Sequence, residues 1–165
     1  MVITDVSLRL KKDNYRLNTS YGAIANLLAS EGISTPSPKD IADIVIDIRT
    51  TKLPDPKQLG NAGSFFKNPI VDHDQFMQLK SSFPDIPHYA QPNQNYKIPA
   101  AWLIEQVGLK GTREGDVGTH KHHALVLVNY GNASGHEIKT FSQKVQQTVE
   151  ERFAIRLQPE VNFCC

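Results

Sequence analysis

Apolar residues fall at helical spacing in one polar stretch of the first third of the chain. They occupy positions i, i+3, i+4 and i+7, which places them on one face of a helix. They are Ile41, Ile44, Val45 and Ile48. Ser37-Pro38 supplies a capping residue followed by a proline that suits the first helical turn. The pattern therefore predicts an amphipathic helix that begins at Pro38 and ends at Leu53-Pro54.

The same spacing, with start and stop residues, predicts three further helices. One is capped by Asp72 and ends before Phe83-Pro84, and a short one runs from Pro99 to Gly108. The longest follows Ser134 and extends to Arg152. Its expected buried stripe consists of Ile138, Phe141, Val145, Val149 and Phe153.

Alternating positions and short apolar runs predict the strands. Residues 2–10 alternate apolar and polar side chains, and 125–128 form a continuous apolar run that suits a buried central strand. Residues 88–90 and 96–98 flank a turn-rich stretch and predict a hairpin, and a last strand is expected over 155–163. We therefore expect an α+β fold, a mixed β-sheet packed by helices.

Composition is that of an ordinary globular protein. The 165 residues are 39% hydrophobic and 21% charged, with a formal net charge of +1, which does not suggest a nucleic-acid partner. No apolar run approaches the roughly 18 residues of a membrane helix, and the N-terminus lacks a signal-peptide core. We therefore expect a cytoplasmic protein. The only cysteines, Cys164 and Cys165, are expected to be free thiols because a vicinal disulfide would be strained.

The run from Gly60 to Pro69, GNAGSFFKNP, is the strongest candidate for chemistry. Its glycines allow a ligand to approach the backbone closely, and Phe65 and Phe66 can exclude water near Ser64. A tight turn entering a buried strand would use similar residues, so that interpretation stays open. Because no Gly-x-Ser-x-Gly elbow surrounds Ser64, the sequence favours a proton donor over a hydrolase nucleophile.

Other polar residues are candidates for catalysis or binding. Glu160 lies in an otherwise apolar terminal stretch, so it must face solvent, be paired or be functional. Ammonium, amide and phenol groups are suited to a diphosphate and a sugar, although each alone would be taken for a surface residue. The residues of this kind are Lys52, Lys67, Asn68, Tyr89 and Lys97.

Histidines cluster at His120-Lys121-His122-His123. Their spacing matches no standard tetrahedral zinc site, and a lysine interrupts them. We therefore expect no metal ion to be bound there.

Three blocks in the same order resemble the UDP-N-acetylenolpyruvoylglucosamine reductase family (MurB). They are RTTKLPDPK at 49–57, the run at 60–69, and LQPEVNF at 157–163, and the resemblance extends from about Val2 to Phe163. Members of that family are flavoenzymes of peptidoglycan synthesis. They reduce the enolpyruvyl ether of UDP-N-acetylglucosamine with NADPH to give UDP-N-acetylmuramate.

The resemblance implies that this chain is only the C-terminal part of such an enzyme. Residues 1–12 would be a remnant strand of the preceding flavin domain, and 13–165 the substrate-binding and catalytic domain. The N-terminal FAD domains of the same native chain would be its partner. FAD and NADPH would serve the full-length enzyme, so we expect this part to hold neither and to be inactive alone.

The resemblance also assigns roles to residues. Ser64 would protonate the substrate, and Glu160, in its protonated form, would stabilise charge that builds on the substrate carboxylate. Matches to the family's substrate contacts are Lys52, Asn68, Tyr89 and Lys97, and His123 stands where a glutamine is usual. The alternative function is a stand-alone module that binds a UDP-sugar or similar anion without redox activity.

Overall fold

The computed structural model describes residues 3–20 and 23–163, and the chain divides into two compact units, residues 1–49 and 50–165. Two sequence expectations lie outside the described residues: Val2 at the start of the first predicted strand, and the free thiols of Cys164 and Cys165. Within the described ranges, none of the helices is long and apolar enough to cross a lipid bilayer.

The first unit contains two helices that share a small core. They are α1 (Ile24–Ser30) and α2 (Pro38–Lys52), whose last residues belong to the second unit. Ile24 and Leu28 of α1 are buried with Ile44 of α2. The predicted helix is therefore confirmed, whereas α1 was not predicted because it is short and has no side-chain cap.

Residues 3–10 form no strand, so that prediction is wrong within the described chain. Apolar side chains of this segment are 72–80% exposed; they are Ile3, Val6, Leu8 and Leu10. An alternating sequence becomes a strand only when a neighbouring strand accepts and donates its backbone hydrogen bonds. No described residue supplies such a strand here. The assignment of residues 1–12 to another domain stays a prediction.

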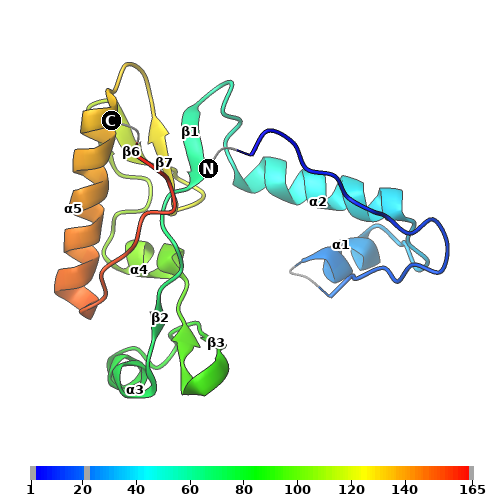
Figure 1. Cartoon of the computed structure of the whole chain (residues 1–165), viewed down its shortest axis with the longest axis horizontal. Coiled ribbons are helices and arrows are strands. Elements are labelled where there is room, and N and C mark those ends of the chain that lie inside the picture. The colour runs from blue at the N-terminus through cyan, green and yellow to red at the C-terminus, as the bar shows by residue number, and fades with distance from the viewer. Residues whose placement is uncertain (1–2, 21–22, 164–165) are drawn as a thin grey trace. The chain divides into compact units, whose positions relative to one another are not determined.

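The larger sheet of the second unit has the strand order β1-β7-β6-β5, with every neighbouring pair antiparallel (Figure 1). Its strands are β1 (Gly60–Ser64), β5 (Arg113–Glu114), β6 (Val117–Thr119) and β7 (Val126–Asn129). β7 is internal and buried, which confirms the predicted central strand. Helix α5 (Gly135–Phe153) lies along β6 and β7 (Figure 1). Leu127 therefore shares one core with Val145 and Val149 of α5.

The smaller sheet has the antiparallel order β2-β4-β3. Its strands are β2 (Ile70–Val71), β3 (Tyr89–Ala90) and β4 (Tyr96–Lys97), with the 3-10 helix η1 (Pro92–Gln94) between the last two. The predicted hairpin is confirmed. Phe76 of α3 (His73–Ser82) stacks on Tyr96 with the ring centroids 4.0 Å apart, and α4 (Ala100–Gln106) follows β4.

The predicted helix starts are confirmed by their hydrogen bonds. Asp72 caps α3 by accepting from the N–H of Gln75 at 2.9 Å. At the start of α5, Ser134 and Glu137 form a capping box in which each side chain accepts from the other's backbone N–H.

The α+β class is confirmed, but the strands form two antiparallel sheets where we expected one mixed sheet. Residues 155–163 form no regular strand, which corrects that prediction. This segment turns back after α5 and pairs with the chain just beyond β1 through an isolated bridge between Phe66 and Pro159 (Figure 1). A single isolated bridge is too short to make the segment a strand.

Candidate functional site

Ser64 ends β1 opposite Val126 of β7, after an irregularity that starts at Asn61. Gly63 adopts a φ of +72° in this bulge. The side chain of Asn61 holds the bulge, since its Oδ1 accepts from the Gly63 N–H at 3.0 Å while Nδ2 donates to the Leu59 carbonyl at 2.8 Å. Ser64 is left exposed, whereas Phe65 is buried. The run thus serves as both a strand and a turn.

Glu160 is held beside this strand end by backbone hydrogen bonds. The N–H of Glu160 donates to the Phe65 carbonyl, and the N–H of Lys67 donates to the Gln158 carbonyl, both at 2.8 Å. Glu160 is therefore opposite the residue that follows Ser64, and both side chains are exposed. The structure therefore brings these two predicted catalytic residues onto neighbouring segments of the backbone.

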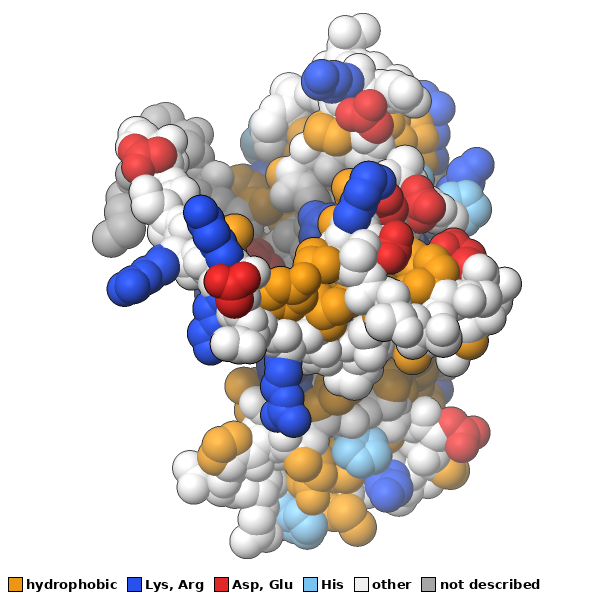
Figure 2. All heavy atoms as spheres, turned by 90° about the vertical axis from the view of Figure 1, so that its right-hand side faces the viewer, with side chains coloured by type: hydrophobic (Ala, Val, Ile, Leu, Met, Phe, Trp, Pro, Cys, Tyr) orange, Lys and Arg blue, Asp and Glu red, His pale blue; other side chains and the backbone are white. Residues whose placement is uncertain are grey.

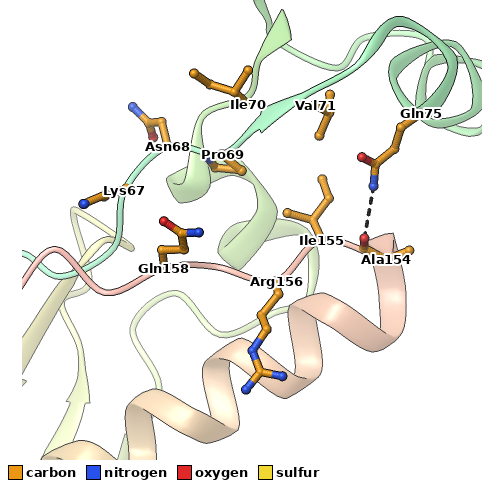
Figure 3. A pocket seen from close by; sticks show the side chains of 10 residues that line it. All are labelled: Lys67, Asn68, Pro69, Ile70, Val71, Gln75, Ala154, Ile155, Arg156 and Gln158. Atoms are coloured by element: carbon orange, nitrogen blue, oxygen red, sulfur yellow. Dashed lines mark hydrogen bonds between the residues drawn. The ribbon is translucent and has the colours of Figure 1, made fainter. Parts of the chain in front are cut away.

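Three predicted substrate-binding residues meet at the smaller sheet. Lys97, on the central strand, pairs with Tyr89 on one side and Ile70 on the other. Residues directly opposite in an antiparallel pair have side chains on the same face. Figure 3 shows Asn68 and Ile70 projecting from the same side of their segment, opposite Pro69 and Val71. Asn68, Lys97 and Tyr89 therefore share a face.

Asn68 has a structural role that the sequence did not indicate. Its Oδ1 accepts from the N–H of Ala100, the first residue of α4, at 2.9 Å. Ala100 is fully buried, so this N–H depends on Asn68 for its hydrogen bond. The Nδ2 group remains as the donor that Asn68 can offer to a ligand.

Lys52 and His123 form the remaining part of the predicted binding site. Burial and then the positive charge of Lys52 lower the pKa of His123, partly offset by Glu105. The ring is half-buried, and its Nδ1 has no hydrogen-bond partner among the described residues. Lys52 and His123 are therefore close enough to interact electrostatically, and His123 is held in its neutral form at neutral pH.

His120 lies in the same connection between β6 and β7 and is buried. Burial is the main cause that lowers its pKa, and its Nδ1 also lacks a partner within the described ranges. The His120 and His122 rings lie 5.5 Å apart. No group of three or more His, Cys, Asp or Glu side chains in the part of the chain that the structure describes is arranged to hold a metal ion.

A cavity of about 420 Å³ lies beside the segment that carries Asn68 (Figure 3). Ten residues line it: Lys67, Asn68, Pro69, Ile70, Val71, Gln75, Ala154, Ile155, Arg156 and Gln158. Gln75 Nε2 donates to the Ala154 carbonyl across it at 3.0 Å. Neither Ser64 nor Glu160 lines this cavity, so it is separate from the predicted catalytic pair.

Asn61 is the residue of the site that sequence reasoning missed. It positions Ser64 through the bulge described above. The signal was the spacing Asn61-Ala62-Gly63, in which an asparagine can bond the backbone N–H two residues on.

Comparison with known proteins identifies the family to which the sequence is related. Residues 55–164 match the family model described as UDP-N-acetylenolpyruvoylglucosamine reductase, C-terminal domain. Proteins named UDP-N-acetylenolpyruvoylglucosamine reductase are 53% identical in Flavobacterium johnsoniae, 46% in Chromobacterium violaceum and 45% in Pseudomonas aeruginosa. These alignments cover 97–98% of this chain and 47–48% of each relative.

The chain therefore spans about half the length of the curated relatives that it matches. The matched residues include Ser64, Asn68, Tyr89, Lys97, His123 and Glu160. The chain belongs to the UDP-N-acetylenolpyruvoylglucosamine reductase family, of which it represents the C-terminal domain.

Proposed function

We propose that this chain is the substrate-binding part of a flavoenzyme that reduces the enolpyruvyl ether of UDP-N-acetylglucosamine to UDP-N-acetylmuramate with NADPH. The observation that carries the proposal is the placement of Ser64 and Glu160 on adjacent segments through the Glu160-to-Phe65 hydrogen bond. A serine hydroxyl and a carboxyl group, exposed together in a domain of this family, are the groups that the protonation step needs.

Reduction of the enolpyruvyl double bond adds a hydride to the terminal carbon and a proton to the adjacent carbon. We assign proton donation to Ser64. Glu160, as the protonated acid, hydrogen-bonds the substrate carboxylate, where negative charge builds as the hydride arrives. Both residues would stabilise the transition state more than the bound substrate, so their removal should lower kcat more than it weakens binding.

We assign binding of the UDP-sugar to two groups of polar residues. One group consists of Lys52 and His123, which offer an ammonium and an imidazole. The other lies on the face of the smaller sheet and offers amide, phenol and ammonium groups from Asn68, Tyr89 and Lys97. Ammonium groups attract the diphosphate, and the neutral donors suit the hydroxyl and amide groups of the sugar.

Flavin supplies hydride transfer when it is bound, but the residues present do not enclose a flavin. Ser64 and Glu160 are exposed, and the cavity of Figure 3 includes neither residue. A redox site must exclude water, so a second surface has to cover this one. We therefore assign FAD to the half of the relatives that this chain does not match, and we expect the purified chain to be colourless.

The test is an activity assay on the chain alone and on the chain joined to the missing half. We expect no NADPH oxidation by the chain alone. A full-length protein, or a chimera with the N-terminal half of the Flavobacterium johnsoniae relative, should oxidise NADPH when UDP-N-acetylglucosamine enolpyruvate is present. An active full-length protein that ignores this substrate would contradict the proposal. A chain that binds the UDP-sugar but never supports reduction would identify a stand-alone binding module.

A further inference from the structure

Ile70 is an aliphatic residue on the surface of the smaller sheet. It begins β2 and is 57% exposed. Tyr89, on the strand at the other edge of the sheet, is 62% exposed. Ile70 belongs neither to the predicted catalytic pair nor to the predicted substrate contacts.

The strand pairing places Ile70 and Tyr89 on either side of Lys97 in one row across the sheet. Strands lie about 4.8 Å apart, so the backbones of the two outer residues are separated by about 10 Å. Lys97 is less exposed than either neighbour. Its methylene stem is therefore flanked by two apolar side chains, and its ammonium group stays available at the surface.

Asn68 extends this row toward the catalytic residues. Asn68 and Ile70 project from the same side of the segment, and both also border the cavity of Figure 3. The Asn68 Oδ1 is used by Ala100, which leaves Nδ2 to face a ligand that lies on Ile70. Asn68 follows Ser64 by four positions in the sequence, a span of at most about 14 Å in extended chain.

The surface around the smaller sheet mixes apolar and basic groups. Figure 2 shows hydrophobic, histidine and lysine or arginine side chains exposed together at the lower end of the molecule, where α3 and the smaller sheet lie in Figure 1, with an acidic side chain at the edge. A ligand with an apolar planar part joined to an anion complements such a surface.

We propose that Ile70 is a further substrate-contacting residue, and that Ile70 and Tyr89 together form an apolar platform for the nucleoside of the UDP-sugar. This proposal rests on the proposed function and adds a determinant of nucleotide specificity to it. The uracil and ribose lie on the platform, and the Lys97 ammonium binds the diphosphate. A free diphosphate would use Lys97 alone, so the two parts of the ligand can be tested separately.

The experiment measures the binding of UDP and of inorganic pyrophosphate to the 165-residue chain by isothermal titration calorimetry. In Ile70→Ala, we expect the affinity for UDP to fall about tenfold, as for the loss of one contacting aliphatic side chain. The affinity for pyrophosphate should not change. Ile70→Leu should restore UDP binding, whereas Lys97→Ala should weaken the binding of both ligands.

Met77→Ala is the matched control, because Met77 is an exposed apolar residue on α3 with 49% of its surface accessible. It should bind UDP as the unmodified chain does, and the melting temperature of each variant reports folding. Equal loss of UDP and pyrophosphate affinity in Ile70→Ala, or no loss, overturns the platform. If the unmodified chain binds UDP no more tightly than pyrophosphate, the platform is overturned too. In that case, loss of binding of both ligands in Lys97→Ala would still support the proposed function. A chain that binds neither ligand overturns both.

Discussion

The backbone N–H of Glu160 donates to the carbonyl oxygen of Phe65 at 2.8 Å, which places an acidic side chain near the C-terminus beside the end of strand β1. This contact uses only backbone atoms, and the side chains of Ser64 and Glu160 are both exposed. Changes to either side chain should therefore leave the bond, and the fold around it, intact. Catalysis and stability can be separated at both positions.

Ser64→Ala should reduce kcat by at least about a hundredfold in a full-length reductase that carries this chain, with a much smaller change in KM. The reason is that proton donation contributes in the transition state and little in the bound ground state. Steady-state kinetics with UDP-N-acetylglucosamine enolpyruvate measure both constants. Ser64→Cys is the matched control, since a thiol can also donate a proton.

Thermal unfolding of the Ser64→Ala chain should match that of the unmodified chain within about 0.5 kcal/mol, as expected for an exposed side chain. A raised KM with unchanged kcat would assign Ser64 to binding and remove it from the protonation step.

Asn68 should respond differently to two substitutions because its two amide atoms have different partners. Asn68→Ala leaves the buried Ala100 N–H without an acceptor and should lower the free energy of unfolding by about 1–3 kcal/mol. Asn68→Asp keeps an acceptor there, so its stability should stay close to that of the unmodified chain. It loses the Nδ2 donor and adds a negative charge near the diphosphate.

Asn68→Asp should therefore weaken UDP binding about tenfold or more without loss of stability. Chemical denaturation and calorimetry on the same samples measure the two effects. Loss of stability in Asn68→Asp equal to that in Asn68→Ala would show that the carboxylate does not replace the amide oxygen. Unchanged UDP binding in a stable Asn68→Asp would remove Asn68 from the substrate site.

Local signals in the sequence predicted the helices well. Helix α5 is an example, since Ser134, Glu137 and its apolar stripe lie within one segment and need no distant partner to be recognised. The hairpin of β3 and β4 is similarly local, and its register places Tyr89 opposite Lys97. This part of the candidate site follows from short-range patterns alone.

The rest depends on contacts between distant segments. Residues 3–10 and 155–163 both have strand-like composition, yet neither forms a strand. The first lacks a partner strand among the described residues, and the second pairs only at one isolated bridge. The bulge at Gly63 and the bond from Ala100 to Asn68 also join positions that no periodic pattern connects. Only the family resemblance indicated that Glu160 belongs with Ser64.

UDP binding should raise the pKa of His123. In the free chain that pKa is lowered by burial and by Lys52, and an anion bound between them favours the imidazolium form. By linkage, protonation of His123 should in turn favour the anion. The pKa of His123 can be followed through its ring carbon-bound proton by NMR, with and without UDP.

In Lys52→Ala, the pKa of free His123 should be higher than in the unmodified chain but still below its ordinary value, because burial remains. The exposed ring of His136 provides an internal control in the same spectra. If the pKa of His123 does not move when UDP saturates the chain, His123 does not contact the diphosphate.

Acid should destabilise the chain through carboxylates that accept backbone hydrogen bonds. The backbone N–H and then the hydroxyl of Ser134 lower the pKa of Glu137, and the N–H of Asn132, followed by Arg113, lowers the pKa of Asp116. A carboxyl whose pKa is lower in the folded state stabilises the fold above its unfolded pKa, near 4. That stabilisation is lost as the pH falls through the folded pKa.

The free energy of unfolding should therefore fall between about pH 5 and pH 2, and Glu137→Gln and Asp116→Asn should each make that fall shallower. Urea denaturation at a series of pH values measures the slope. Asp85→Asn is the matched control, because no described residue donates a hydrogen bond to this exposed carboxylate. An equal slope in Glu137→Gln and Asp85→Asn would show that the capping box contributes nothing to acid sensitivity. Because both variants remove one acidic group, their change in net charge is the same, and any difference belongs to the hydrogen bonds at Ser134.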